Sequence, residues 1–567
     1  MTSRALEQQL TPEANRAALS ERRLAWRIAG ALAVVLAAAW VVGAEVYARL
    51  ILPAPPLNFD EAAHSLPGYY VLRDILALDL RALWGDFHIQ TLWPPGFSLL
   101  QAPFLGVLGR SDESARLFAY LMLVAAALVG FAVASEIAPA RAAEAGLVSA
   151  LIALSAPGWL FVGSWAMQET PVAFVSLVCF WLYLRAQRTG RLVEFAASSA
   201  ALYFLFLTKF NYTAFALASV LLVQFVRTAG QVHSKGLSAL RRAVAEWLAL
   251  LLPFVGGVLF WFFGGTDIVP TEVKWRDFRF FITNEDSGYP FWSAENLLFY
   301  VRATLDWLMP SPWLALAAAL GAGWAIARVR HPGVWLLAIF FGLGFVLATI
   351  HPLKANRYIT PIFPALWLLT GLGAADFLTW LRHRLERTLR AALRAAQLVF
   401  WALVGALTLW SWLHWLPNLK PVWAGDAAND LRAAAAQIVR WQQPERPILI
   451  IGTFGELSPP LFEWRLRPLP GIGNAPHPIQ YDAPPVEGES DLARVRRWLA
   501  EHPSAQVTVI TLDERSVLYQ THDMRTKNAW RQALSHAFVR ESGYQPLEVV
   551  EFPASGLQVR YYLPSAN

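Results

Sequence analysis

The sequence predicts a polytopic α-helical membrane protein with a small external α/β domain at its C-terminal end. Hydrophobic residues make up 56% of the 567 residues, and the mean hydropathy is +0.39. Eleven apolar runs approach the roughly 20 helical residues that cross a bilayer core. After Pro417, helical and strand patterns alternate instead. This composition excludes a soluble enzyme, a disordered chain and a fibrous protein.

Cationic residues between the apolar runs predict the orientation of the spans. Lys and Arg gather in alternate loops and in the N-terminal tail, residues 1–24, which the positive-inside rule assigns to the cytoplasm. An odd number of spans across the cell's inner membrane then places the C-terminal portion outside. The two short runs at 194–208 and 211–227 indicate a tight outer hairpin. The predicted spans lie near residues 25–50, 115–137, 143–163, 170–186, 194–208, 211–227, 244–263, 311–328, 333–350, 360–381 and 395–416.

Three outer segments are long enough to form structure: residues 52–114, 264–310 and 417–567. The first two belong to the membrane domain, residues 25–416. The first has amphipathic stretches that predict helices along the outer interface, at 69–83 and 97–108, broken by the WPPG sequence at 93–96. The third alternates a helix at 427–441, a strand at 448–451, a helix at 491–501 and a strand at 507–512, which indicates an α/β domain.

Charge and cysteine usage exclude several functions. The net charge is +6, but the cations flank apolar runs and report topology, so nucleic acid is not an expected partner. Cys179 is the only cysteine, and therefore no intrachain disulfide is possible. The sequence contains no P-loop and no G-x-G-x-x-G pattern, which counts against an ATP-driven pump.

Ionisable residues next to the first outer segment are candidates for chemistry. Residues 58–64 read NFDEAAH, and in a helix Asp60 and His64 would share one face, with Glu61 pointing elsewhere. A carboxylate facing a low-dielectric pocket serves as a general base or a metal ligand. The alternative explanation is a capped helix start.

Glu169 and Lys209 mark two further outer positions. Glu169 precedes a helix start at Pro171, where the helix dipole alone also favours a carboxylate. Lys209, with Asn211 and Tyr212, occupies the tip of the predicted hairpin, where a cation runs against the positive-inside tendency. Snorkelling of the lysine is the alternative.

The loop at 351–361 carries His351, Lys354 and Arg357, followed by Tyr358. Three potential cations in an outer loop indicate an anionic ligand, because Arg and Lys are the usual partners of phosphate. Binding of lipid headgroups without catalysis is the alternative. All of these candidates fall on one predicted side of the membrane.

Together, these motifs resemble the GT-C glycosyltransferase superfamily. The resemblance rests on five short motifs: Asp60-Glu61, the WPPG sequence, the QETP sequence at 168–171, Thr208-Lys209 and the RYITP sequence at 357–361. They are similar to the branch that contains the protein O-mannosyltransferases and the lipid A aminoarabinose transferases. The resemblance covers roughly residues 20–420, and the external C-terminal domain varies between members.

The resemblance implies a polytopic GT-C-like enzyme that moves a hexosyl or pentosyl group from a polyprenyl-phosphate carrier to a lipid, glycan or protein acceptor at the outer face. Asp60 would be the catalytic carboxylate and Glu169 the second acidic residue, near the acceptor or a metal. Lys209 and Arg357 would bind phosphate. Their neighbours in the motifs are expected to line the substrate site: Glu61, His64, Asn211, Tyr212, His351, Lys354 and Tyr358.

One departure from the family concerns His64, where members often have an aromatic residue. Asp60, Glu169 and His64 are acceptable ligands for a divalent cation, so a metal site is one alternative, and a hydrogen-bonding wall residue is the other. Without a nucleotide-binding loop, the lipid itself would deliver the activated sugar. A single displacement with inversion, with Asp60 as base, is the simplest mechanism. A transporter or flippase of lipid-linked sugars remains the alternative function, although the inverted repeats typical of transporters are not evident.

Overall fold

The structure is a computed structural model, and it divides into two compact units. A helical unit comprises Met1–Tyr47, Phe87–Phe97 and Leu117–Leu419, and a sheet unit comprises Ala48–Asp86, Ser98–Arg116 and Lys420–Asn567. The first outer segment, expected as a loop of the membrane domain, thus groups largely with the C-terminal portion. The described residues are 12–283, 292–351, 354–385, 390–421, 425–441, 446, 448–451, 457, 459–466, 479–481, 498–512 and 543–564.

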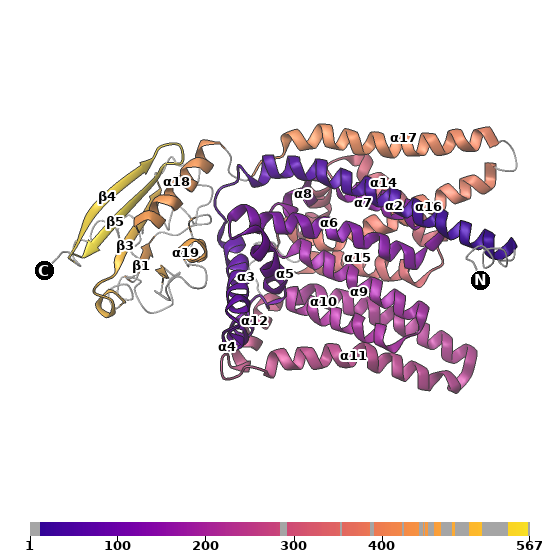
Figure 1. The fold of residues 1–567 in the computed structure, drawn as a ribbon, viewed down its shortest axis with the longest axis horizontal. Coiled ribbons are helices and arrows are strands. Elements are labelled where there is room, and N and C mark those ends of the chain that lie inside the picture. Colours follow the sequence, from indigo (N-terminus) through magenta and orange to yellow (C-terminus); the bar gives the residue numbers. More distant parts are fainter. Residues whose placement is uncertain are drawn as a thin grey trace, which may run out of the picture. The chain divides into compact units, whose positions relative to one another are not determined.

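Long apolar helices build the helical unit, and many of them run side by side (Figure 1). A helix satisfies its own backbone hydrogen bonds, which makes it suitable for crossing a bilayer. The helices that lie wholly or mostly in this unit are α2 (Pro12–Val46), α6 (Asp112–Ile137), α7 (Ala142–Ala153), α8 (Pro157–Gly163), α9 (Glu169–Thr189), α10 (Leu192–Lys235), α11 (Leu240–Phe263), α12 (Thr271–Thr283), α13 (Ala294–Arg302), α14 (Pro312–Arg328), α15 (Pro332–Ile350), α16 (Phe363–Leu385) and α17 (Arg390–Trp415).

The number of candidate spans is lower than the eleven expected. In the described part of the chain, eight helices are long and apolar enough to cross a membrane, or up to ten if each of two bent helix pairs is one span. Bends of 77° between α7 and α8, and of 118° before α14, separate the members of these pairs. Each following helix begins with a proline, Pro157 or Pro312, which suits a first helical position. The count of eleven therefore stays a prediction.

The chain reverses direction within α10. The backbone of Lys209 is extended, at φ −166° and ψ 102°, and interrupts the helix. The Arg227 guanidinium lies 5.7 Å from the centre of the Phe195 ring. In a straight helix, these two residues would be about 48 Å apart. Leu192–Lys235 is one of the eight helices counted above. Its two arms nevertheless fold back on each other at Lys209, as the sequence predicts.

Small residues allow α14 and α16 to pack closely. A Cβ added to Gly373 would lie 1.9 Å from the carbonyl oxygen of Gly321. A Cβ added to Gly371 would lie 2.2 Å from the carbonyl oxygen of Ala145 on α7. Close backbone approach through glycine is typical of helix packing in membranes. These contacts fix α7, α14 and α16 as one block.

The sheet unit combines helices from the first outer segment with the C-terminal sheet. Its helices include α3 (Phe59–Ala77), most of α4 (Leu80–Ile89), most of α5 (Gly96–Leu108), α18 (Asp426–Trp441) and α19 (Pro459–Leu466). Helix α3 begins ten residues before the expected position 69, because Asn58 caps its start. It ends where Leu78 adopts a left-handed conformation. The expected helix at 97–108 matches α5.

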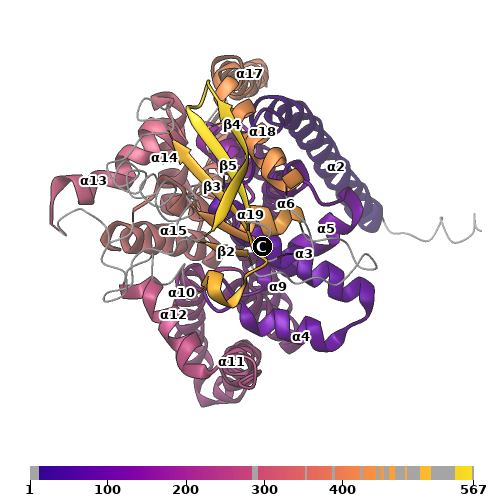
Figure 2. The same cartoon turned by 90° about the vertical axis from the view of Figure 1, so that its left-hand side faces the viewer.

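Five strands form one sheet in the order β2-β1-β3-β5-β4. The strand β1 (Ile448–Ile451) is parallel to both β2 (Ile479–Tyr481) and β3 (Gln506–Leu512). A hairpin of β4 (Tyr544–Phe552) and β5 (Leu557–Pro564) adds antiparallel strands beside β3. Figure 2 shows β3, β5 and β4 side by side, with α18 alongside. The sheet confirms the predicted α/β character, and part of the expected helix at 491–501 lies outside the described residues.

Candidate active site

A buried carboxylate between two cations forms the centre of the candidate site in the helical unit. The Lys209 Nζ lies 2.9 Å from Glu169 Oε1, and the Arg357 Nε lies 3.8 Å from the same oxygen. The Glu169 side chain is 1% exposed, compared with 14% for Lys209 and 19% for Arg357. The formal charges of these three side chains sum to +1. The structure brings together these three sequence-predicted residues.

Backbone geometry at the hairpin tip positions Lys209. A Cβ added to Gly96, the last residue of the WPPG sequence, would lie 2.5 Å from the Thr208 nitrogen. Only glycine permits this approach of two backbones. The buried Pro94 and Pro95 restrict the conformation of the chain that leads to it. The WPPG sequence therefore packs directly against the turn that carries Lys209.

Aromatic residues surround the Lys209 ammonium. Its Nζ lies 5.6 Å from the centre of the Tyr212 ring and 5.4 Å from that of Tyr358, within the range of cation–π attraction. The Tyr212 hydroxyl donates a hydrogen bond to the Tyr358 carbonyl, which joins α10 to the short 3₁₀ segment Asn356–Ile362. Asn211 is exposed, and its side chain accepts from the Tyr212 backbone nitrogen. Tyr212 thus holds α10 and the Asn356–Ile362 segment together around Lys209.

The Lys354 ammonium contacts the C-terminal end of α15. Its Nζ donates to the carbonyls of Ala348 at 3.0 Å and Thr349 at 2.5 Å, and it lies 5.3 Å from the centre of the Tyr300 ring. A lysine at a helix C-terminus satisfies carbonyls that the helix leaves without partners. Burial lowers the pKa of Lys354 to about 8. His351 is half-buried at the end of the same helix.

Asp60, Glu61 and His64 all lie in α3 of the sheet unit. Asn58 and Glu61 form a capping box, with the Glu61 nitrogen 3.0 Å from Asn58 Oδ1 and the Asn58 nitrogen 3.1 Å from Glu61 Oε2. Asp60 is half-buried in the first turn, and His64 is buried four residues later on the same face. The helical geometry assumed for this pair is therefore present.

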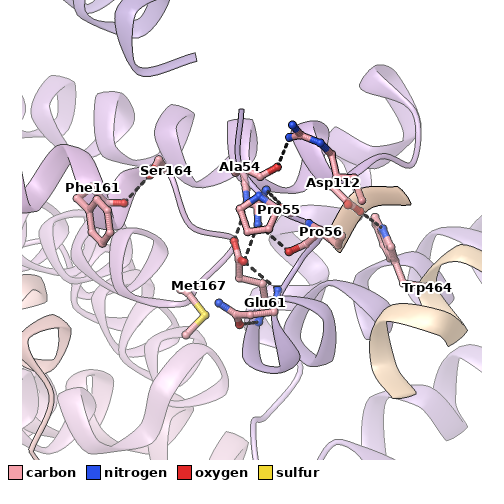
Figure 3. A network of polar contacts seen from close by, with 12 residues as sticks. Ala54, Pro55, Pro56, Glu61, Asp112, Phe161, Ser164, Met167 and Trp464 are labelled. Carbon is pink, nitrogen blue, oxygen red and sulfur yellow. Dashed lines mark hydrogen bonds and ion pairs between the residues drawn. The ribbon is translucent and has the colours of Figure 1, made fainter. Parts of the chain in front are cut away.

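Two arginines hold the segment that leads to Asp60 within the sheet unit. Arg116 pairs with Glu61 at 2.8 Å, and both side chains are almost fully buried. Arg116 also donates to the carbonyls of Pro55 and Pro56. Figure 3 shows Pro55 and Pro56 beside Glu61. Arg432 on α18 donates to the Ala54 carbonyl at 2.6 Å and to the Leu52 carbonyl at 3.3 Å. Residues 52–56 therefore have a fixed backbone path.

Sequence reasoning missed both arginines. Arg116 is a single cation at the start of an apolar run, and the positive-inside rule places that start outside. A cation on the outer side is unusual, and this was the signal that could have identified Arg116. Arg432 lies on the polar side of an amphipathic helix and gives no such signal. Both residues contact backbone carbonyls far away in the sequence, so spacing carries no information about the pairing.

A second buried group fixes the start of the segment Phe87–Phe97. The Lys274 Nζ lies 3.1 Å from His88 Nδ1 and donates to the carbonyls of Trp261 and Gly264 at 2.7 Å. Burial and the neighbouring Lys274 charge lower the pKa of His88 to about 4, so the imidazole is neutral at physiological pH. The lysine ties α12 and α11 to the segment that contains the WPPG sequence.

No cluster of metal-ligand type is present among the described residues: no three His, Cys, Asp or Glu side chains form a group that could hold a metal ion. The metal site of Asp60, Glu169 and His64 stays a prediction. Glu169 contacts two cations, Lys209 and Arg357, and Lys and Arg side chains are usual partners of anions.

Comparison with known proteins shows the fold. No protein-family model and no curated protein matches the sequence. The structure of ArnT from Cupriavidus metallidurans bound to undecaprenyl phosphate aligns with a TM-score of 0.58 at 15% identity, covering 94% of this chain and 98% of that chain. The same protein in the apo state aligns with a TM-score of 0.56 and 15% identity over the same shares. The chain therefore has the GT-C fold that the sequence predicts.

Proposed function

We propose that the chain is an integral-membrane glycosyltransferase that moves a sugar from a polyprenyl-phosphate carrier to an acceptor at the outer face of the membrane. The observation that carries this proposal is the pair of cations, Lys209 and Arg357, that contact the buried Glu169. The GT-C fold supports it, because ArnT, which shares that fold, has been solved with undecaprenyl phosphate bound.

The proposed chemistry is a single displacement with inversion. Asp60 accepts the proton of the acceptor hydroxyl, whose oxygen forms a bond to the anomeric carbon. The bond between that carbon and the phosphate oxygen breaks, and its electron pair stays on the phosphate. Lys209 and Arg357 compensate the charge of the departing polyprenyl phosphate. Glu169 holds both cations in place and keeps their excess charge at one.

The remaining assignments follow from this scheme. The donor is a polyprenyl-phosphate-linked hexose or pentose, and the acceptor is a lipid, a glycan or a protein. The N-terminus is cytoplasmic, and residues 417–567 lie outside the inner membrane. Glu61 acts through Arg116 on the segment before Asp60, and Lys354 and Tyr212 support the phosphate site. The candidate ligands for a divalent metal ion are Asp60, His64 and Glu169.

The direct test is release of polyprenyl phosphate. The purified full chain, reconstituted in liposomes, would be incubated with polyprenyl-phosphate hexoses and pentoses and with candidate acceptors. Sugar transfer with stoichiometric polyprenyl phosphate release would support the proposal. Its loss in Lys209→Ala, with retention in the exposed Lys235→Ala, would locate it at this site. Movement of the intact lipid-linked sugar across the bilayer without release would instead indicate the transporter.

A further inference from the structure

An apolar cavity lies in the helical unit, apart from the Glu169 group. It has a volume of about 460 Å³ and is lined by α7, α14, α16 and α17, with Leu151, Leu320, Phe377 and Leu407 among its walls. Ligand pockets in proteins commonly have volumes of this order. From Leu314 to Trp324, its wall on α14 extends for about 15 Å at the rise of an α-helix. The cavity is therefore elongated along the helices.

Two hydrogen bonds fasten α17 near one end of this cavity. The Ser411 hydroxyl donates to the Ser155 carbonyl at 2.6 Å, and the Trp412 indole donates to the Leu154 carbonyl at 2.9 Å. Both carbonyls are available because the helix breaks between α7 and α8. Elsewhere α17 is little buried, because only 6% of its most apolar stretch lies inside the protein. Before the fastened end, residues of α17 between Phe400 and Thr408 line the cavity.

A charged group lies at the opposite end. Trp324, a wall residue, donates to Asp376 Oδ2 at 3.0 Å. Arg141 Nη1 lies 2.5 Å from Asp376 Oδ1, and Arg328 Nε lies 3.5 Å from Oδ2. Two arginines against one carboxylate leave one positive charge in excess. The Arg141 and Arg328 side chains are 33% and 49% exposed, so both remain accessible to an anion.

We infer that the cavity between α7, α14, α16 and α17 binds one phospholipid with an anionic headgroup, with one of its acyl chains lying along α17 and its phosphate at Arg141 and Arg328. An apolar cavity that ends at exposed cations matches a lipid with one apolar and one anionic end. The fastened end limits the depth to that of an acyl chain, which disfavours a long polyprenyl chain. The site is separate from the proposed phosphate site at Lys209.

Filling the cavity tests the acyl-chain part of this assignment. The full chain would be purified from membranes in mild detergent, and bound phospholipid would be measured by native mass spectrometry. Val404 lines the cavity, whereas Val399, on the same helix, is 58% exposed and does not. We expect Val404→Trp to lose the phospholipid that the original chain and Val399→Trp retain. Ala317→Phe fills the cavity from α14 and serves as a second variant if Val404→Trp misfolds.

Exchange of the bound lipid tests the headgroup part. The delipidated chain would be mixed with nanodiscs of phosphatidylglycerol or phosphatidylethanolamine. The original chain should retain the anionic phosphatidylglycerol preferentially. Arg328→Gln should remove this preference, and Arg191→Gln, at an exposed arginine of another loop, should keep it. Retention of phospholipid by both filled variants, no bound phospholipid in the original chain, or a polyprenyl phosphate as the retained lipid would each overturn the inference.

Discussion

Individual side chains in the candidate site have contacts that the sequence indicated only in part. The sequence predicted Lys209 and Arg357 as phosphate ligands and Glu169 as an acidic residue near the acceptor or a metal, and the structure brings these three together. Their mutual pairing was not predictable, because the residues come from three distant segments. Tyr212 contacts the Tyr358 carbonyl and the Lys209 ammonium, and Lys354 contacts the end of a helix and the Tyr300 ring. Their expected contact with substrate stays a prediction.

Replacement of Asp60 tests the proposed base. Asp60→Asn preserves the shape but removes the proton acceptor, so we expect kcat to fall by about 10²–10⁴, the usual contribution of a positioned acid or base. Asp79→Asn makes the same change at an exposed carboxylate of the same unit and should retain activity. Turnover would be measured by polyprenyl phosphate release from equally expressed proteins. Near-normal turnover of Asp60→Asn would remove this residue from the mechanism.

The two cations near Glu169 differ in what each substitution should reveal. A guanidinium binds two phosphate oxygens and a lysine only as a point charge, so Arg357→Lys should lower kcat as well as raise KM. Lys209→Ala should do the same, because charge develops on the leaving phosphate. Steady-state kinetics with a polyprenyl-phosphate sugar measure both effects. Unchanged kinetics at both positions would assign the cations to headgroup anchoring.

We expect Lys354 to give the activity a pH dependence. Because burial lowers the pKa of Lys354 to about 8, its ammonium is charged below that pH and loses its charge as the pH rises through it. Activity that depends on this charge should therefore fall above pH 8. Lys354→Arg keeps the charge and should move the fall to higher pH, as a pH–rate profile would show. An identical profile in Lys354→Arg and in the exposed control Lys235→Arg would contradict this role.

At the scale of elements, sequence patterns predicted most helices and missed the way they break and join. Apolar runs indicated α9, α11 and α15 to within a few residues, because proline and charged residues mark their ends. The sharp bend between α7 and α8 was read as one continuous run, since Leu154 and Ser155 are compatible with a helix. The antiparallel hairpin of β4 and β5 also went unpredicted.

The contact between the WPPG sequence and the α10 turn provides a test at this scale. Gly96→Ala would force a methyl group against the Thr208 backbone, and overpacking of this kind costs about 1–3 kcal/mol. We expect a lower thermal unfolding midpoint and impaired turnover. Gly85→Ala places its methyl group in open space within a helix and should be neutral or stabilising. Equal behaviour of the two variants would exclude a positioning role for Gly96.

For the whole molecule, composition was sufficient to predict the fold class but not to predict which segments form each of the two units. Hydropathy predicted a polytopic protein, and the GT-C fold is confirmed. The sheet unit, however, joins residues 48–86 and 98–116 to residues 420–567. This grouping depends on contacts such as that of Trp464 and Arg465 with Asp112, at 3.1 and 2.6 Å. Such partners are distant in the sequence and leave no local periodicity.

Orientation in the membrane is testable by labelling. Cys179 is buried, so cysteines introduced into a Cys179→Ser chain would report single positions. Leu80→Cys and Leu547→Cys should react with an impermeant maleimide from outside intact cells, because the positive-inside rule places both segments there. Arg191→Cys and Lys235→Cys should react only after permeabilisation. The opposite pattern would invert the predicted topology and remove the outer-face assignment.

The arginine contacts around residues 52–56 also have a consequence for biosynthesis. Synthesis proceeds from the N-terminus, so the carbonyls of Leu52 and Ala54 emerge long before Arg432, which binds them in the finished structure. Arg116 reaches its partners Pro55 and Pro56 much earlier. We therefore expect the segment before Asp60 to complete its contacts only after α18 has been made.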